Sequence, residues 1–249
     1  MPPCPMGSFL YTILPGDTLW IIARRYNTTV HAIAAVNPGL DMNNLYIGQV
    51  ICIRPEYGYY PANPSAMGIS KAEADLKNHL RMLWEQHVVW TRLTILSIVF
   101  GLPDVDQVTN RLLRNPKDFE AALKLFYGDE IASTFADLFT NHLVIAAELV
   151  KAAKAGNSGA AADAERRWYA NADEIAAFLG SINPYWSQDD WKAMLHEHLA
   201  LTKTEAVNLL TGNYSEGIST FDEIEKQALK MADVMAYGIV KQFPDKFTA

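Results

Sequence analysis

The chain has 249 residues, enough for one large domain or two ordinary ones with hydrophobic cores. Half of the residues are apolar and a fifth are charged, a composition that excludes a disordered chain. The net charge is −7, and the sequence has no basic run, so we expect no binding to nucleic acid.

No membrane-spanning segment is expected. The longest strongly apolar stretch, residues 93–102, is far shorter than the roughly twenty residues that a membrane span needs. The N-terminal residues show neither the cationic nor the apolar region of a secretory signal. We therefore expect a protein without a signal peptide that is synthesised in the cytosol.

The first sixty residues predict two short strands that enclose two short helices. A β-rich run at 9–13 precedes a turn, after which Asp17 can cap a helix over 18–26. Thr29 can cap a second helix, which stops before an Asn-Pro-Gly sequence, and residues 49–53 form the second strand. The predicted order is strand, helix, helix, strand.

A set of residues between Tyr11 and Arg54 carries a family resemblance. They are Tyr11-Thr12-Ile13, Pro15-Gly16-Asp17-Thr18-Leu19, Ile22-Ala23, Tyr26, Ile33, Asn37-Pro38, Leu45, Gly48-Gln49 and Ile51. At this spacing the segment resembles the LysM carbohydrate-binding module. The resemblance implies a βααβ module over residues 1–55 that binds the N-acetylglucosamine units of peptidoglycan or chitin in a shallow groove.

The resemblance also implies the glycan-binding residues, which lie in two loops. They are Gly16, Asp17, Thr18 and Leu19 after the first strand, and Pro38, Gly39, Leu40 and Asp41 before the second. Loop backbone groups and small apolar contacts suit an N-acetyl sugar. In such a module the two cysteines, Cys4 and Cys52, approach bonding distance. In the reducing cytosol we expect free thiols, with a bridge forming on oxidation.

Residues 56–69 are rich in proline and tyrosine and predict a linker between two domains. Residues 70–249 predict an all-α helical bundle, which makes the fold mainly α. Capping pairs occur at Ser70 with Glu73, Ser187 with Asp190, and Thr220 with Glu223, and glycines 128, 156, 180 and 212 stand where helices should end. The expected long helices are 70–100, 130–155, 159–179, 188–211 and 220–243, with two shorter ones between 104 and 127.

Polar residues interrupt the apolar stripes of the long helices near their middles. His87, His142, His198 and Glu205 stand where apolar residues are due, and they should meet at a similar depth in a bundle. One interpretation is a metal site, for which zinc or iron is the candidate ion. The favoured alternative is an internal hydrogen-bond network without metal.

Catalytic motifs are absent from the sequence. It contains no His-Glu-x-x-His, no Gly-x-Ser-x-Gly and no phosphate-binding glycine loop, so no catalytic residue is assigned and enzymatic activity is not favoured. The tryptophans of the helical part are expected in its core rather than around a sugar.

The sequence therefore predicts an N-acetylglucosamine-polymer binding protein. Proteins with similar modules suggest a bacterial envelope or spore coat, and the bundle would mediate homo-oligomer or coat assembly, or ligand binding. The alternative is a metal-binding bundle or metalloenzyme that the LysM module localises.

Overall fold

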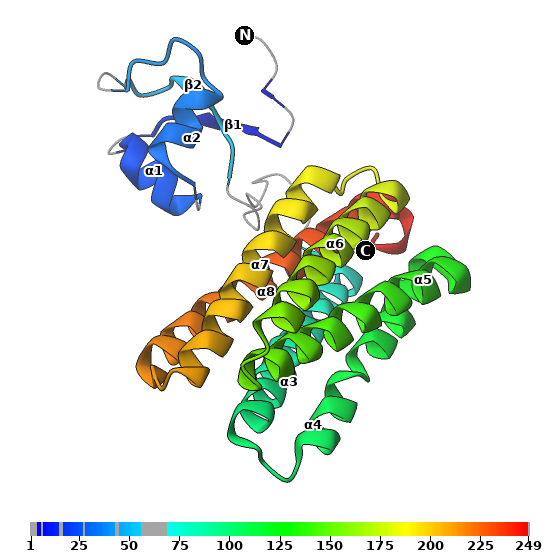
Figure 1. Cartoon of the computed structure of the whole chain (residues 1–249). Helices are drawn as coiled ribbons and strands as arrows, with labels where there is room; N and C mark the ends of the chain where they lie inside the picture. Colours follow the sequence, from blue (N-terminus) through cyan, green and yellow to red (C-terminus); the bar gives the residue numbers. More distant parts are fainter. Residues whose placement is uncertain are drawn as a thin grey trace. The chain divides into compact units, whose positions relative to one another are not determined.

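The computed structural model divides into two compact units, residues 1–68 and 69–249, which we describe separately (Figure 1). The expected linker, apart from its last residue, lies outside the described residues. The structure describes residues 4–5, 7–14, 17–26, 28–42, 45–55 and 69–248.

The first unit has the predicted order of elements. Its elements are β1 (Phe9–Thr12), α1 (Leu19–Arg25), α2 (Val30–Ala35) and β2 (Val50–Ile53). The two strands pair antiparallel, with Leu10 opposite Cys52, and the helices lie between them in the sequence. Alternate strand residues and one face of each helix enclose a small core of Ile13, Leu19, Ile22, Ala23, Ile33, Ile51 and Ile53. The prediction of a small βααβ unit is confirmed.

Helix starts in this unit are set by hydroxyl side chains. Thr29 accepts a hydrogen bond from the amide of Ala32, at 3.0 Å, as predicted. At the first helix, however, it is the hydroxyl of Thr18 that accepts from the amide of Ile21, at 3.2 Å. Asp17 was expected to cap this helix, but its carboxylate is bound elsewhere.

A disulfide joins Cys4 to Cys52. The two Cα atoms are 5.6 Å apart, within the range that a bridge requires. The expected approach of the two cysteines is confirmed, whereas the expectation of free thiols differs from the bridged state of this structure. The bridge ties the chain ahead of β1 to the second strand.

The second unit is a helical bundle, as predicted. Its elements are α3 (Lys71–Phe100), α4 (Val105–Leu112), α5 (Asn115–Lys154), α6 (Ser158–Ile182), α7 (Gln188–Leu210), α8 (Tyr214–Gln242) and a short 3₁₀ turn η1 (Pro244–Lys246). The five long helices make their most extensive contacts in the cyclic order α3, α5, α6, α7, α8 and back to α3, and α3 also contacts α7 across the bundle (Figure 1). Among the described residues, no helix is long and apolar enough to span a membrane.

Two helix boundaries differ from the sequence prediction. α8 begins at Tyr214 rather than 220, and the hydroxyl of Thr220 donates to the carbonyl of Glu216 inside the helix. A threonine that bonds to its own helix in this way is no longer a cap. Gly180 lies inside α6, where a Cβ atom would approach Gln188 to 3.0 Å, so its role is close packing rather than helix termination.

The other predicted glycine breaks are present. Gly128 has φ +79° and separates two helical stretches of α5 at a kink. Gly156 and Gly212 have φ of +68° and +79° just after α5 and α7. These left-handed values suit glycine, because it lacks a Cβ atom.

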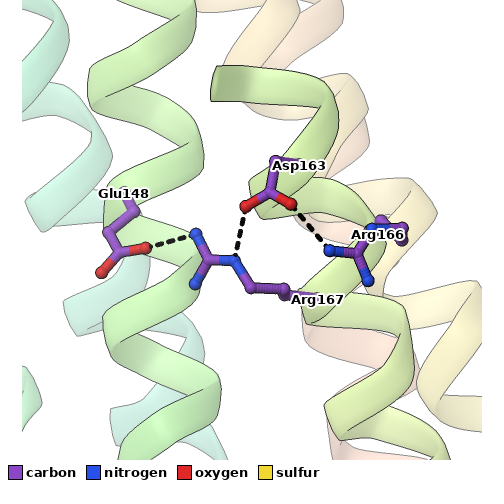
Figure 2. A network of polar contacts seen from close by, with 4 residues as sticks. All are labelled: Glu148, Asp163, Arg166 and Arg167. Atoms are coloured by element: carbon purple, nitrogen blue, oxygen red, sulfur yellow. Dashed lines mark hydrogen bonds and ion pairs between the residues drawn. The ribbon is translucent and has the colours of Figure 1, made fainter. Parts of the chain in front are cut away.

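A network of exposed ion pairs connects α5 to α6 on the outside of the bundle (Figure 2). Arg167 donates to Glu148 of α5 at 2.7 Å and to Asp163 of its own helix at 2.8 Å. Arg166 donates to the other oxygen of Asp163 at 2.7 Å. Because water screens these groups, the network orients the helices more than it stabilises them.

Candidate functional site

The loop after β1 is organised by Asp17, whose side chain is only 2% exposed. The hydroxyl of Tyr11 and the amide of Leu14 both donate to its Oδ2, at 2.5 and 2.9 Å. Arg25 approaches Oδ1 to 3.0 Å. Both carboxylate oxygens are therefore engaged within the protein, and Asp17 positions the loop rather than presenting a free acceptor to a sugar.

The electrostatics of this cluster agree with a fixed, ionised carboxylate. Burial opposes ionisation, but the hydrogen bonds from Tyr11 and Leu14 and the charge of Arg25 together lower the pKa of Asp17. Burial and the bond to Asp17 raise the pKa of Tyr11 to about 12. Tyr11 therefore stays a proton donor, and the cluster is intact at neutral pH.

The second predicted loop is anchored by Asn37, which the resemblance already marked. Its side-chain amide donates to the carbonyls of Ile33 and Cys52, at 2.7 and 2.6 Å, and its Oδ1 accepts from the amide of Cys52 at 2.7 Å. This side chain thus joins the end of α2 to β2. The loop that follows is held at its base while its tip remains open to solvent.

The predicted glycan-binding residues differ in exposure. Thr18, Pro38, Gly39 and Asp41 are exposed, and Gly16 lies outside the described residues. Leu19 is buried and Leu40 is half-buried, and both pack on the same apolar core. The two loops therefore rest on one core, from which four exposed residues and the loop backbone can reach a ligand.

Sequence reasoning missed three exposed apolar side chains near the first loop. Leu14, Tyr46 and Ile47 are 52%, 65% and 66% exposed. They lie at one end of the sheet, because the amide of Ile13 donates to Gln49 and the amide of Gly48 donates back to Ile13. The sequence signal for their exposure was the position of Tyr46 and Ile47 directly before Gly48-Gln49. Residues in a turn at the end of a strand have few core residues against which to pack.

In the helical unit, two of the predicted polar residues meet directly. Nε2 of His87 lies 3.3 Å from Nε2 of His198. Gln227 donates its side-chain N–H to the carbonyl of Met194, so its Oε1 accepts from Nδ1 of His198, at 3.0 Å. A neutral imidazole carries one N–H, which in His198 is on Nδ1. Nε2 of His198 is therefore an acceptor, and Nε2 of His87 donates to it.

The third histidine, His142, belongs to a separate set of hydrogen bonds. The side-chain amide of Asn171 donates to the carbonyl of Leu138, which leaves its Oδ1 to accept from Nδ1 of His142 at 2.9 Å. The indole of Trp168 donates to Nε2 of His142 at 3.1 Å. Both ring nitrogens of His142 are thus occupied by protein partners.

All three histidines are held in the neutral form. Burial is the largest cause, and it lowers the pKa of His142 to about 3 and that of His198 to about 4. Burial and the two neighbouring histidines place the pKa of His87 well below its usual value. The histidine contacts therefore place no charge in the core, although Nδ1 of His87 is buried without a hydrogen-bond partner among the described residues.

The fourth predicted ligand, Glu205, is 1% exposed and forms an ion pair with Arg92. Burial raises the pKa of Glu205, against the opposing effect of Arg92. Among the residues that the structure describes, no three His, Cys, Asp or Glu side chains are placed to hold a metal ion. The predicted zinc or iron site is not found there. His87 and His198 contact each other, His142 bonds to Asn171 and Trp168, and Glu205 pairs with Arg92.

A repeated motif could have indicated the histidine contact. His87 begins the sequence His-x-x-x-Thr-Arg on α3, and His198 begins His-x-x-x-Thr-Lys on α7. The same spacing on both helices puts a threonine one turn beyond each histidine. Two equivalent motifs in one bundle are typical of residues that face a common interior.

The first unit is thus a small βααβ module in which polar side chains brace two loops. A family model, described as LysM domain, matches residues 11–54, so this segment is a LysM domain, as the sequence predicted. The "Secreted LysM effector Blys4" of Beauveria bassiana (strain ARSEF 2860) is 45% identical over 51 residues, which is 20% of this chain. The match spans only 30% of that relative's length. No solved structure gives a significant match.

Proposed function

We propose that the first unit binds polymers of N-acetylglucosamine, either chitin or peptidoglycan. The observation that carries the proposal is the LysM domain at residues 11–54, with the predicted binding loops braced by the polar side chains of Asp17 and Asn37. Asp17 and Asn37 hold the loops, and the exposed loop residues contact the sugar. Preformed loops lose little conformational entropy when a ligand binds.

The exposed apolar side chains extend this surface. A sugar ring has an apolar face, and its acetyl group adds a methyl. The ring of Tyr46 offers a flat apolar face for such a contact, and Leu14 and Ile47 flank the same end of the sheet. We propose that Tyr46 contributes to affinity, while loop backbone groups of residues 38–41 bind the acetamide.

The disulfide supports an oxidising location outside the cytosol. Bridges of this kind persist in secreted and cell-surface proteins and are rare in the cytosol. The matched relative is named as a secreted protein. We therefore propose an extracellular or wall-associated protein. A bacterial envelope or spore setting, and coat or homo-oligomer assembly, remain predictions from the sequence.

The proposal is tested by sedimentation of the full chain with insoluble chitin and with peptidoglycan. We expect binding to at least one polymer and competition by soluble N-acetylglucosamine oligomers. Tyr46→Ala should weaken binding about fivefold, because it removes the exposed ring and keeps the amide that donates to Gln49. The matched control is Tyr185→Ala, an exposed tyrosine in the helical unit.

Two results would contradict the proposal. One is the absence of binding to both polymers by a protein whose disulfide is intact. The other, which concerns the assignment of Tyr46, is equal affinity for Tyr46→Ala and Tyr185→Ala. A thermal unfolding curve of each variant shows whether any loss of binding comes from loss of the fold.

A further inference from the structure

The helical unit contains an apolar cavity of about 280 Å³, lined by residues of α3, α4, α5, α6 and α7. Buried side chains of two hydrophobic clusters line it. Ile95, Ile98 and Ala206 belong to the smaller cluster, and Leu149 and Trp168 belong to the main core. The cavity is also open to solvent, because Ser158, Lys203 and Val207, which line part of it, are exposed.

The size of this cavity sets the size of a ligand. Protein interiors are close-packed and hold few voids larger than a water molecule. An engineered apolar cavity of about 150 Å³ remains dry and binds benzene, which has six carbon atoms. A cavity of about 280 Å³ is nearly twice as large, and by proportion suits roughly ten to twelve non-hydrogen atoms.

The walls of the cavity carry few polar groups, and one of these groups has no hydrogen-bond partner among the described residues. The hydroxyl of Thr91 is buried and has no hydrogen-bond partner among the residues that the structure describes. The hydroxyls of Thr94 and Thr202 donate to carbonyls of their own helices, both at 2.8 Å. Among the described lining residues, Thr91 therefore offers the cavity a buried hydroxyl that is free to bond to a ligand, whereas Ser158 is exposed to solvent.

The charges at the cavity cancel one another. Glu165 and Lys203 are the charged residues among those that line it, and they form an ion pair at 2.6 Å. Their charges sum to zero, so the wall offers no net charge to balance that of an ionic ligand. Charge neutrality of the wall favours a neutral ligand.

The walls are also held in place without a ligand. Arg167, next to the cavity-lining Trp168, bonds to Glu148 of α5 on the outer surface (Figure 2). On its inner side the indole of Trp168 is fixed by His142. A preformed wall of this kind is typical of small-molecule sites.

We propose that this cavity binds a compact, neutral and mainly apolar molecule with one hydroxyl or carbonyl group, which forms a hydrogen bond with Thr91. Medium-chain alcohols and ketones have the size and chemistry required. The site lies wholly in the helical unit and does not depend on glycan binding by the LysM domain.

The test uses isothermal titration calorimetry of the full chain with 1-octanol and, as the charged analogue of equal chain length, octanoate. We expect saturable binding of one 1-octanol per chain, with affinity at least tenfold greater than for octanoate. Thr91→Val should weaken 1-octanol binding about threefold to tenfold, because it removes the hydroxyl and keeps the shape.

Filling the cavity should abolish binding. Ala206→Leu places a larger side chain into it from α7, and Ala147→Leu does so from α5, in case one variant fails to fold. The matched control, Ala200→Leu, changes an exposed alanine of the same helix as Ala206 and should bind like the wild type.

Three results would overturn the proposal. They are the absence of saturable 1-octanol binding to the wild type, equal affinity for octanoate, and undiminished binding by folded Ala206→Leu and Ala147→Leu proteins. An unchanged affinity of Thr91→Val would refute the hydrogen bond assigned to Thr91.

Discussion

Acidification should destabilise the helical unit through its buried histidines. In the folded state the pKa is about 3 for His142 and about 4 for His198, and that of His87 is also well below its usual value. In the unfolded chain each returns to about 6.5. The unfolded state therefore binds more protons, so stability is full above pH 6.5 and falls as the pH decreases.

The magnitude follows from these pKa values. Between pH 7.5 and pH 5, His142 and His198 each reduce the free energy of unfolding by about 2 kcal/mol, since each costs 1.36 kcal/mol per pH unit once the unfolded form is protonated. His87 adds to the loss in the same direction. Glu205, whose pKa burial raises, works in the opposite direction because its proton is held more tightly in the folded state.

The assay is urea unfolding of the full chain at several pH values between 7.5 and 5. Circular dichroism at 222 nm reports mainly the helical unit, because all the long helices belong to it. This window lies above the ordinary pKa values of the exposed carboxylates, which limits their contribution.

A variant isolates the contribution of one ring. His198→Gln should flatten the slope of unfolding free energy against pH by about 1 kcal/mol per unit below pH 6, whatever its effect on absolute stability. His79→Gln changes an exposed histidine and should leave the slope as it is. A total change below about 1 kcal/mol between pH 7.5 and 5, or the same slope for both variants, would refute the reasoning.

Three further predictions concern stability. Reduction of the disulfide, which spans 48 residues, should destabilise the first unit by about 4 kcal/mol by the loop-entropy relation, as shown by faster proteolysis of that unit while the helical signal is unchanged. Asn37→Ala should cost the same unit about 2–3 kcal/mol in denaturant unfolding, because it leaves an amide and a carbonyl of β2 without their partner; an effect below about 0.5 kcal/mol would contradict this role. Gly238→Ala should lower the melting temperature of the helical unit, because the new methyl would overlap the indole of Trp186, whereas Gly159→Ala, with more space, should not.

Much of the local structure could be predicted because its causes are local. Ser70 and Ser187 accept hydrogen bonds from amides three residues later, at 3.1 and 3.3 Å, as the capping spacing indicated. Thr220 has the same spacing but lies within α8. A capping pair is also compatible with a helix interior, and the sequence alone does not distinguish the two.

The two loops that the resemblance assigns to glycan binding contain residues whose partners only the structure shows. The resemblance located Asp17 and Leu19 next to the first strand. The structure shows that Asp17 is bound by three protein partners and that Leu19 belongs to the core. Exposure and partnership depend on which distant residues pack nearby, as Arg25 does against Asp17.

The sequence by itself determined the LysM domain, the helical nature of the remainder and the burial of His87, His142 and His198, because these follow from local spacing and the period of the helix. Only the tertiary structure decided the partners: His87 meets His198, whereas Glu205 turns to Arg92. The cavity lined by Thr91 is likewise visible only in the tertiary structure, because no sequence pattern predicts it. The physical reason is that contacts between helices depend on how each helix is rotated and positioned along its axis in the bundle. Packing between side chains that are far apart in the sequence determines both.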